Sequence, residues 1–191
     1  MKFDVIYDDS GDAMEKMKTA CFSGYRPEKF SFIMHRGVDA YLALEKRIEK
    51  TILQAVDDGY SCFMCGMAKG FDLVAGSIVM ALKESWPELS YVDLVAVVPF
   101  QDHGFSGNPW HVLHEMVLGA ASDVVVLSPE YHSLVYHDRN HYMVDHSSRL
   151  ICYYDGKKGG TDQTVKYAGE QGLTIVNVLR SQAGNAKHLK S

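Results

Sequence analysis

The sequence predicts an α/β fold, a doubly wound and mostly parallel sheet with helices on both faces. Two observations carry this prediction. Short runs of β-branched, aromatic and small residues alternate along the chain with longer stretches whose apolar residues recur at helical spacing. No internal repeat or low-complexity segment interrupts this alternation over the 191 residues. Strands that are joined by crossover helices form a parallel sheet.

Six segments have the composition of buried strands. The first three are followed directly by Gly24, Gly66 and Pro99, residues that turn the chain or stop a strand. The expected strands cover residues 19–23, 61–65, 91–98, 123–127, 150–154 and 173–178.

The segments between these strands have helical periodicity, with apolar residues three or four positions apart. The first stripe is Tyr41, Leu44, Ile48, Ile52 and Ala55; the second is Phe71, Val74, Ala75, Ile78, Val79 and Leu82; the third is Trp110, Leu113, Val117 and Ala121. Two further helices are expected, one over the polar stretch around residues 139–147 and one after Thr161.

Length and composition predict a single domain, residues 1–191, with a core over about 19–179 and peripheral segments at 1–18 and 182–191. Hydrophobic residues make up 47% of the chain and charged residues 23%, and no apolar run is long enough to span a membrane, so a soluble globule is expected. The acidic start lacks the features of a signal peptide, which predicts a cytoplasmic location and no membrane partner. A net charge of −5 argues against a nucleic-acid partner.

The four cysteines include a CxxC pair, Cys62 and Cys65, which invites a redox or zinc interpretation. On a strand, however, residues three apart point to opposite faces, so these two cannot both bind one metal. The nine histidines fix no ligand set either, although His137 and His141 lie one helical turn apart. We therefore expect buried structural cysteines and no metal site.

Chemistry is expected in the loops after the strands, because ligands of doubly wound sheets bind beyond the carboxyl ends of the strands. Glycine permits close approach of the backbone, a helix N-terminus offers free N–H groups, and arginine supplies countercharge, a combination that suits phosphate. The candidate residues are Gly24, Tyr25 and Arg26 after the first strand, Gly66, Gly70 and Asp72 after the second, and Gly159, Gly160 and Thr161 after the fifth.

Each candidate also has a simpler interpretation that stays open. Glycines after strands often only close turns, Asp72 suits a helix N-cap, and Arg26 suits a surface ion pair. Their common position at one predicted edge of the sheet favours binding.

A polar stretch between the fourth and fifth strands supplies further candidates. Arg139 and Asn140 offer charge-assisted and amide hydrogen bonds, and Asp145 could hold a ribose hydroxyl or orient Arg139. The same charges could equally be solvated on the surface of a helix.

Taken in this order, the motifs resemble the YpsA-like branch of the SLOG superfamily. They are Phe-Ser-Gly-Tyr-Arg-Pro at 22–27, Gly-x-Ala-x-Gly-Phe-Asp at 66–72, Pro-Phe-Gln at 99–101, Arg-Asn-x-x-Met-Val-Asp-x-Ser at 139–147 and Gly-Gly-Thr at 159–161. The resemblance runs from about residue 19 to 179 and implies a Rossmann-like fold that binds nucleotides or nucleotide-derived ligands. The implied pocket contains Gly24, Arg26, Gly66, Gly70, Asp72 and the turn at 159–161, with Arg139 and Asn140 on one side.

The sequence departs from the family's pattern at two places. Met67 stands where a second glycine is commoner, and no glutamate follows Gly160 and Thr161 at the spacing of the superfamily's phosphoribohydrolases. Because hydrolysis of an N-glycosidic bond needs a carboxylate near the ribose, the missing glutamate argues against that activity.

The expected function is therefore the binding or sensing of a nucleotide-type small molecule such as ADP-ribose, NAD or a nucleoside phosphate. A nucleotide-processing enzyme that uses Asp72, Asp145 or Glu115 is the alternative, and single-stranded DNA binding is a third, less favoured one. No catalytic residue and no cofactor beyond such a nucleotide are assigned. Superfamily relatives often self-associate, so the resemblance points to a homodimer.

Overall fold

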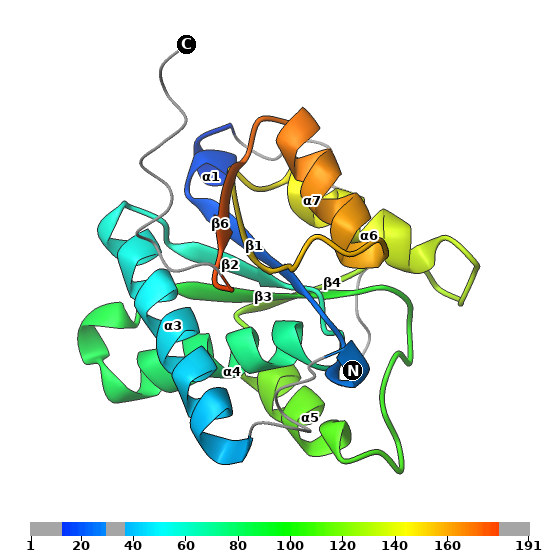
Figure 1. The fold of residues 1–191 in the computed structure, drawn as a ribbon, viewed down its shortest axis with the longest axis horizontal. Helices are drawn as coiled ribbons and strands as arrows, with labels where there is room; N and C mark the ends of the chain where they lie inside the picture. The colour runs from blue at the N-terminus through cyan, green and yellow to red at the C-terminus, as the bar shows by residue number, and fades with distance from the viewer. Residues whose placement is uncertain (1–12, 30–36, 180–191) are drawn as a thin grey trace.

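The computed structural model describes residues 13–29 and 37–179. Six strands form one sheet in the order β4-β3-β2-β1-β5-β6, and every described pair of neighbouring strands is parallel (Figure 1). The strands are β1 (Thr19–Gly24), β2 (Cys62–Cys65), β3 (Asp93–Val98), β4 (Asp123–Val126), β5 (Arg149–Tyr153) and β6 (Thr174–Asn177). The predicted α/β class is confirmed, and each strand lies within two residues of its expected bounds.

Helices connect successive strands in the predicted places. They are α3 (Gly37–Asp57), α4 (Phe71–Ser85), α5 (Trp110–Ala120), α6 (Val135–Asp145) and α7 (Gly160–Glu170), with short 3-10 turns η1 (Pro27–Lys29) and η2 (Pro87–Leu89). A further short helix, α1 (Ala13–Met17), precedes β1 and was not predicted. Strand β3 begins two residues later than expected because the N–H of Val92 donates to the carbonyl of Leu89 and prolongs the turn at η2. The expected peripheral segments at both ends lie largely outside the described residues.

The helices form two layers around the sheet. Helices α3, α4 and α5 cover one face, whereas α6 and α7 cover the other (Figure 1). After β4 the chain returns to place β5 beside β1, so the strand order reverses between β1 and β5. This reversal is the switch point at which doubly wound sheets bind their ligands.

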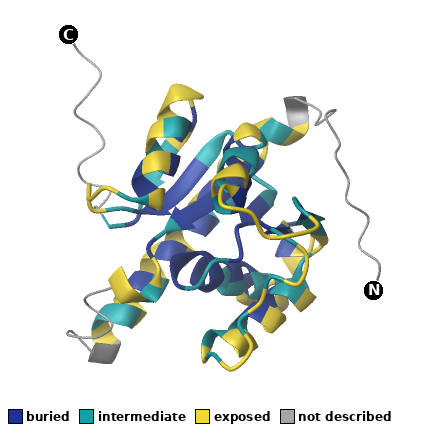
Figure 2. Cartoon of the chain, turned by 90° about the vertical axis from the view of Figure 1, so that its right-hand side faces the viewer, coloured by how far each residue is buried: buried dark blue, intermediate teal, exposed yellow. Residues whose placement is uncertain are grey.

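Alternating strand side chains supply the two halves of the core, and Figure 2 shows the strands buried between the helix layers. Phe22 and Phe63 are fully buried on the α4 side, with ring centroids 5.9 Å apart. Cys21 and Cys152 pack on the opposite face. Full burial of a large apolar side chain stabilises the fold by about 1.5–3 kcal/mol relative to exposure.

The cysteines are all free thiols. Cys21, Cys65 and Cys152 are buried, whereas Cys62 is half-buried at the start of β2. Burial raises the pKa of the Cys65 thiol to about 12. The interpretation of these residues as structural is consistent with that burial.

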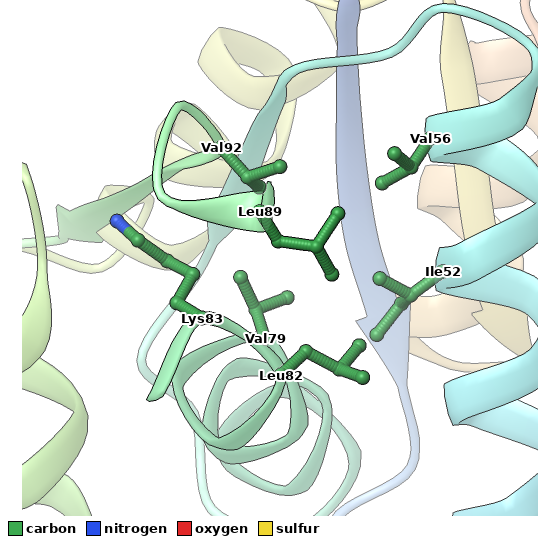
Figure 3. A pocket seen from close by; sticks show the side chains of 7 residues that line it. All are labelled: Ile52, Val56, Val79, Leu82, Lys83, Leu89 and Val92. Atoms are coloured by element: carbon green, nitrogen blue, oxygen red, sulfur yellow. The ribbon is translucent and has the colours of Figure 1, made fainter. Parts of the chain in front are cut away.

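A small apolar hollow lies between α3, α4 and η2 (Figure 3). It is lined by Ile52, Val56, Val79, Leu82, Lys83, Leu89 and Val92, and the Lys83 ammonium points away from it. Its volume of about 10 Å³ leaves room for one water molecule at most, so it is a packing gap and not a ligand site.

Within the described ranges, no helix combines the length and the apolar character that crossing a membrane requires.

Candidate functional site

The loops after β1, β2 and β5 meet at one edge of the sheet, at the switch point. β1 lies between β2 and β5, so the residues that follow these three strands are neighbours although they are far apart in the sequence. The predicted residues Tyr25, Gly66 and Gly159 lie in these loops. The structure thus brings the three predicted loops together.

Arg139 and Asp72 form a buried ion pair beneath the second loop. Their side chains are 7% and 5% exposed, and Arg139 Nη1 lies 3.8 Å from Asp72 Oδ2. Arg139 Nη1 also donates to the carbonyl oxygen of Gly66. The predicted arginine therefore organises the second loop from below instead of presenting a free cation to solvent.

Asn140 connects this ion pair to the fifth-strand loop. Its Oδ1 accepts from Arg139 Nε at 2.9 Å, and its Nδ2 donates to Thr164 Oγ1 at 2.9 Å. Thr164 Oγ1 in turn donates to the carbonyl of Gly160 at 3.0 Å. This chain of hydrogen bonds joins the loop after β2 to the first turn of α7.

Tyr25 ties the first loop to both of the others. Its carbonyl accepts from the N–H of Phe71 at 3.1 Å, and its hydroxyl donates to Asp155 Oδ1. Asp155 also pairs with Lys157 at 2.9 Å, and this lysine together with Tyr25 lowers the pKa of the carboxyl to about 2. Because the Tyr25 side chain is only 4% exposed, its main contribution is to fix the loops.

Glycine at positions 24 and 66 is required by packing. A Cβ at position 66 would lie 2.6 Å from Arg139 Nη1 and 2.8 Å from Asp72 Oδ2, and a Cβ at position 24 would overlap the ring of Phe71. Met67, which replaces the commoner glycine, adopts a φ of 57° with its side chain fully buried. The left-handed backbone of this loop is therefore kept without the glycine.

The N-termini of α4 and α7 differ in how open they are. The first N–H of α4 is taken by the Tyr25 carbonyl, and the buried carboxylate of Asp72 lies in its first turn. Neither helix has a side-chain cap, and α7 also carries a buried acid in its first turn, Asp162, whose carboxylate accepts from Tyr154 and Lys166. A Cβ on Gly160 would meet nothing within 4 Å. An anion is attracted to free helix amides, and the open backbone at Gly160 makes the N-terminus of α7 the more accessible of the two.

Basic side chains surround this edge. Arg26 is exposed and lies 5.5 Å from the ring centroid of Tyr136, and the Lys29 ammonium lies 5.5 Å from that of Tyr25. Lys29 Nζ also comes within 3.1 Å of the position a Cβ would take on Gly159. Among the residues in the described ranges, Arg26, Lys29 and Lys69 take part in no salt bridge.

The Asp72 carboxyl is the most perturbed acid of the site. Burial raises its pKa to about 6, although the Arg139 guanidinium and backbone hydrogen bonds from Ala68 and Gly24 counteract the rise. The same burial lowers the pKa of Arg139. A carboxyl with a pKa near neutrality can take up and release a proton at physiological pH, a property common among catalytic acids and bases.

Sequence reasoning missed several residues that lie at this edge. They are Lys29, Lys69, His103, Phe105 and Tyr136. The clearest local signal lies in the loop after β3, where Asp102 takes a φ of 62°. A positive φ at a residue other than glycine is uncommon and often marks a functional loop, but it is invisible without coordinates.

Three residues weighed from the sequence do not join the site. Asp145 ends α6 just before β5, at the opposite edge of the sheet, where it accepts from the Tyr167 hydroxyl at 2.7 Å. The rings of His137 and His141 lie tilted to each other with centroids 3.9 Å apart, and no group of three metal-ligating side chains is found within residues 13–29 and 37–179. Asp145 therefore does not orient Arg139, and it lies away from the loops of the candidate site.

The fold and the site together define a Rossmann-like α/β protein with a cationic loop cluster at the switch point of its sheet. The family model described as YspA SLOG family (YpsA) matches residues 20–175. The chain therefore belongs to the YpsA family of SLOG proteins, as its motifs predicted.

Individual relatives agree with this assignment. The chain is 26% identical over 151 residues to a UPF0398 protein of Halalkalibacterium halodurans, covering 76% of each chain. It is 24% identical over 148 residues to the UPF0398 protein YpsA of Bacillus subtilis, covering 76% of this chain and 80% of that protein.

A solved structure shares the fold. DNA processing protein A from Helicobacter pylori, whose structure describes a single-stranded DNA binding mode, superposes with a TM-score of 0.54 at 15% identity. The match covers 91% of this chain and 74% of that protein. At this identity the likeness establishes a common fold and nothing about a common ligand.

Proposed function

We propose that the protein binds a nucleotide or nucleotide-derived small molecule, of the ADP-ribose, NAD or nucleoside phosphate type, at the switch point of the sheet. The observation that carries the proposal is the uncapped N-terminus of α7, open at Gly160, with the Lys29 ammonium beside Gly159. Helix amides and a nearby cation are the usual partners of a phosphate group. Arg26 supplies a second, exposed charge from the neighbouring loop.

The hydrogen-bond chain behind the site supports the same function. Arg139, Asn140 and Thr164 hold the second and fifth loops at a fixed separation. A preformed site loses little conformational entropy when a ligand binds. The predicted residues Arg139 and Asn140 thus serve as positioning residues in this proposal.

Calorimetric titration tests the proposal with a panel of ADP-ribose, NAD, AMP and a cyclic nucleotide. We expect the native protein to bind at least one of them. Arg26→Ala should weaken that binding by about tenfold or more, because it removes a charge-assisted contact. Gly160→Ala should weaken it by a similar factor, because the added methyl group stands where a phosphate would approach the helix amides. Absence of binding by the native protein to every member of the panel would overturn the proposal.

Matched controls separate loss of the site from general damage. Arg47→Ala removes an exposed arginine from α3, and Gly119→Ala adds a methyl group in α5 where nothing lies within 4 Å. Both variants should bind like the native protein. A comparable loss in the controls would mean that the effect of Arg26 or Gly160 is not specific to the site.

A nucleotide-processing enzyme is the second candidate, and the pKa of Asp72 is the observation that favours it. A carboxyl with a pKa of about 6 suits general acid–base catalysis near neutral pH. The side chain is almost fully buried beneath the second loop, which favours a structural part in the site instead. Release of a free base or ribose 5-phosphate from a nucleotide library, lost in Asp72→Asn, would establish the enzyme; no release would exclude it.

A further inference from the structure

Six aromatic rings gather beside the cationic loops. Phe100, His103 and Phe105 come from the loop after β3, His114 from α5, Tyr131 from the loop after β4, and Tyr136 from the first turn of α6. We refer to this set as the aromatic cluster. His103 lies near its centre, with ring centroids 5.2 Å from Phe100, 5.1 Å from Phe105 and 6.0 Å from Tyr136.

The aromatic cluster is partly open to solvent. Tyr131 is 63% exposed, and Phe100 and Tyr136 are half-buried. Tyr131 meets Phe100 and Tyr136 at centroid distances of 5.6 and 6.3 Å in edge-to-face arrangements. Accessible ring faces held by such contacts are the stacking surfaces that proteins offer to nucleobases.

The cations of the glycine-containing loops contact this cluster directly. Arg26, from the loop after β1, lies over Tyr136 at 5.5 Å, and Lys69, from the loop after β2, lies over Phe105 at 5.0 Å. A ligand whose phosphate meets Arg26 therefore has the aromatic cluster within reach of its other end. The aromatic cluster is thus in direct contact with cations of the loops after β1 and β2.

Two imidazole nitrogens inside the cluster have unused hydrogen-bonding capacity. His103 Nδ1 and His114 Nε2 are buried and find no hydrogen-bond partner in the described part of the chain. Burial, together with His114 and the cations Arg139, Arg26 and Lys69, lowers the pKa of His103 to about 4, so the ring is neutral at physiological pH. A neutral imidazole has one donor and one acceptor, the groups that read the polar edge of a base.

We infer that the aromatic cluster is a base-binding subsite, and that the ligand class is a nucleotide with an aromatic base stacked at Tyr136 and Phe100 and hydrogen-bonded by His103. The inference rests on the proposed function, since the phosphate loops place the ligand. It goes further by excluding sugar phosphates that lack a base.

AMP and ribose 5-phosphate test the inference directly because they differ in the base alone. The native protein should bind AMP about tenfold or more tightly than ribose 5-phosphate, the range expected for stacking one base. Phe100→Leu should remove this preference and leave the affinity for ribose 5-phosphate unchanged. Tyr136→Leu should also remove the preference, but because the Tyr136 ring lies under Arg26 this variant is expected to weaken the binding of both compounds. Tyr136→Phe, which keeps the ring, should retain the preference. Tyr91→Leu, which removes an exposed ring at the opposite end of β3, is the matched control.

The outcomes distinguish the two claims. Equal affinities for AMP and ribose 5-phosphate would overturn the base subsite and leave phosphate binding intact. Binding of neither compound, nor of any member of the nucleotide panel, would overturn the proposed function as well. If both leucine variants still prefer AMP, the base binds elsewhere and the inference is overturned. If the protein binds a thymidine oligonucleotide in a salt-sensitive way and does not bind AMP, the cluster is a single-stranded DNA site instead.

A second measurement keeps the test decisive if a leucine variant fails to fold. In the native protein, AMP should shift the imidazole NMR resonances of His103 and His114 while ribose 5-phosphate leaves them in place. Unchanged histidine resonances at saturating AMP would overturn the inference.

Discussion

Replacing Asp72 with asparagine is expected to make the protein more stable at neutral pH. Burial raises the pKa of the carboxyl from 3.8 to about 6. A carboxyl whose pKa is higher in the folded than in the unfolded chain binds its proton more tightly when folded. Its protonation therefore favours folding, an effect that is complete below about pH 4 and is lost as the pH rises through about 6.

The magnitude follows from the two pKa values. A pKa of 3.8 in the unfolded chain against about 6 in the fold corresponds to about 3 kcal/mol of lost stability at neutral pH. Asparagine has the shape of the protonated acid and carries no charge, so it leaves the Arg139 guanidinium without its counter-ion. That loss is already included in the magnitude, because the pKa of about 6 is the net result of burial and of the attraction to Arg139. The Asp72→Asn variant should therefore exceed the native protein by up to about 3 kcal/mol above pH 7, and the two should converge near pH 4.

Urea unfolding at a series of pH values from about 4 to about 8 measures this difference. Asp57→Asn, at an exposed position near the end of α3, is the control and should keep the pH dependence of the native protein. The reasoning is refuted if Asp72→Asn is less stable than the native protein and its deficit grows as the pH rises. That result would mean that Arg139 and the loop amides more than offset the cost of burying the carboxylate.

Three further predictions concern the framework of the site. Arg139→Met should destabilise the fold by about 3–5 kcal/mol in urea unfolding, because it leaves the Asp72 carboxylate buried without its cation. Adding Asp72→Asn to this variant should recover part of the lost stability. Strictly additive effects of the two substitutions would contradict the coupling. Gly66→Ala should cost about 1–3 kcal/mol through the clash with Arg139, whereas the helical control Gly119→Ala should not destabilise; equal effects would argue against the close approach. The thiols of Cys21 and Cys65, whose pKa burial raises to about 12, should resist alkylation at neutral pH without denaturant, as followed by mass spectrometry; rapid labelling of either would contradict their burial.

The fold was predictable because local patterns and the sheet agree. Buried parallel strands appear as short apolar runs, and the crossover helices carry apolar stripes that face the sheet. The main deviation, the late start of β3, arises from the turn at Val92 and Leu89, which an apolar run cannot reveal.

The candidate site was predictable only in part. Loops after parallel strands share one edge, so Gly24, Gly66 and Gly159 could be grouped from their positions in the sequence. The partners of Arg139 could not be deduced, because its contacts with Gly66 and Asp72 depend on how α6 packs. Asp145 lies six residues further along α6, a rise of about 9 Å, and therefore reaches the other edge.

The aromatic cluster was beyond sequence reasoning for a related reason. Phe100, His103, Tyr131 and Tyr136 come from two separate loops and a helix, and nothing in their spacing indicates that their rings meet. Their proximity results from the adjacency of β3 and β4 in the sheet.

Titration of the native protein and of Arg26→Ala with AMP and ADP-ribose tests the central claim, that the switch-point edge binds nucleotides, most directly. Saturable binding by the native protein, weakened by about tenfold or more in Arg26→Ala and unchanged in Arg47→Ala, is the predicted result. Absence of binding by the native protein, or equal binding by all three proteins, would contradict it.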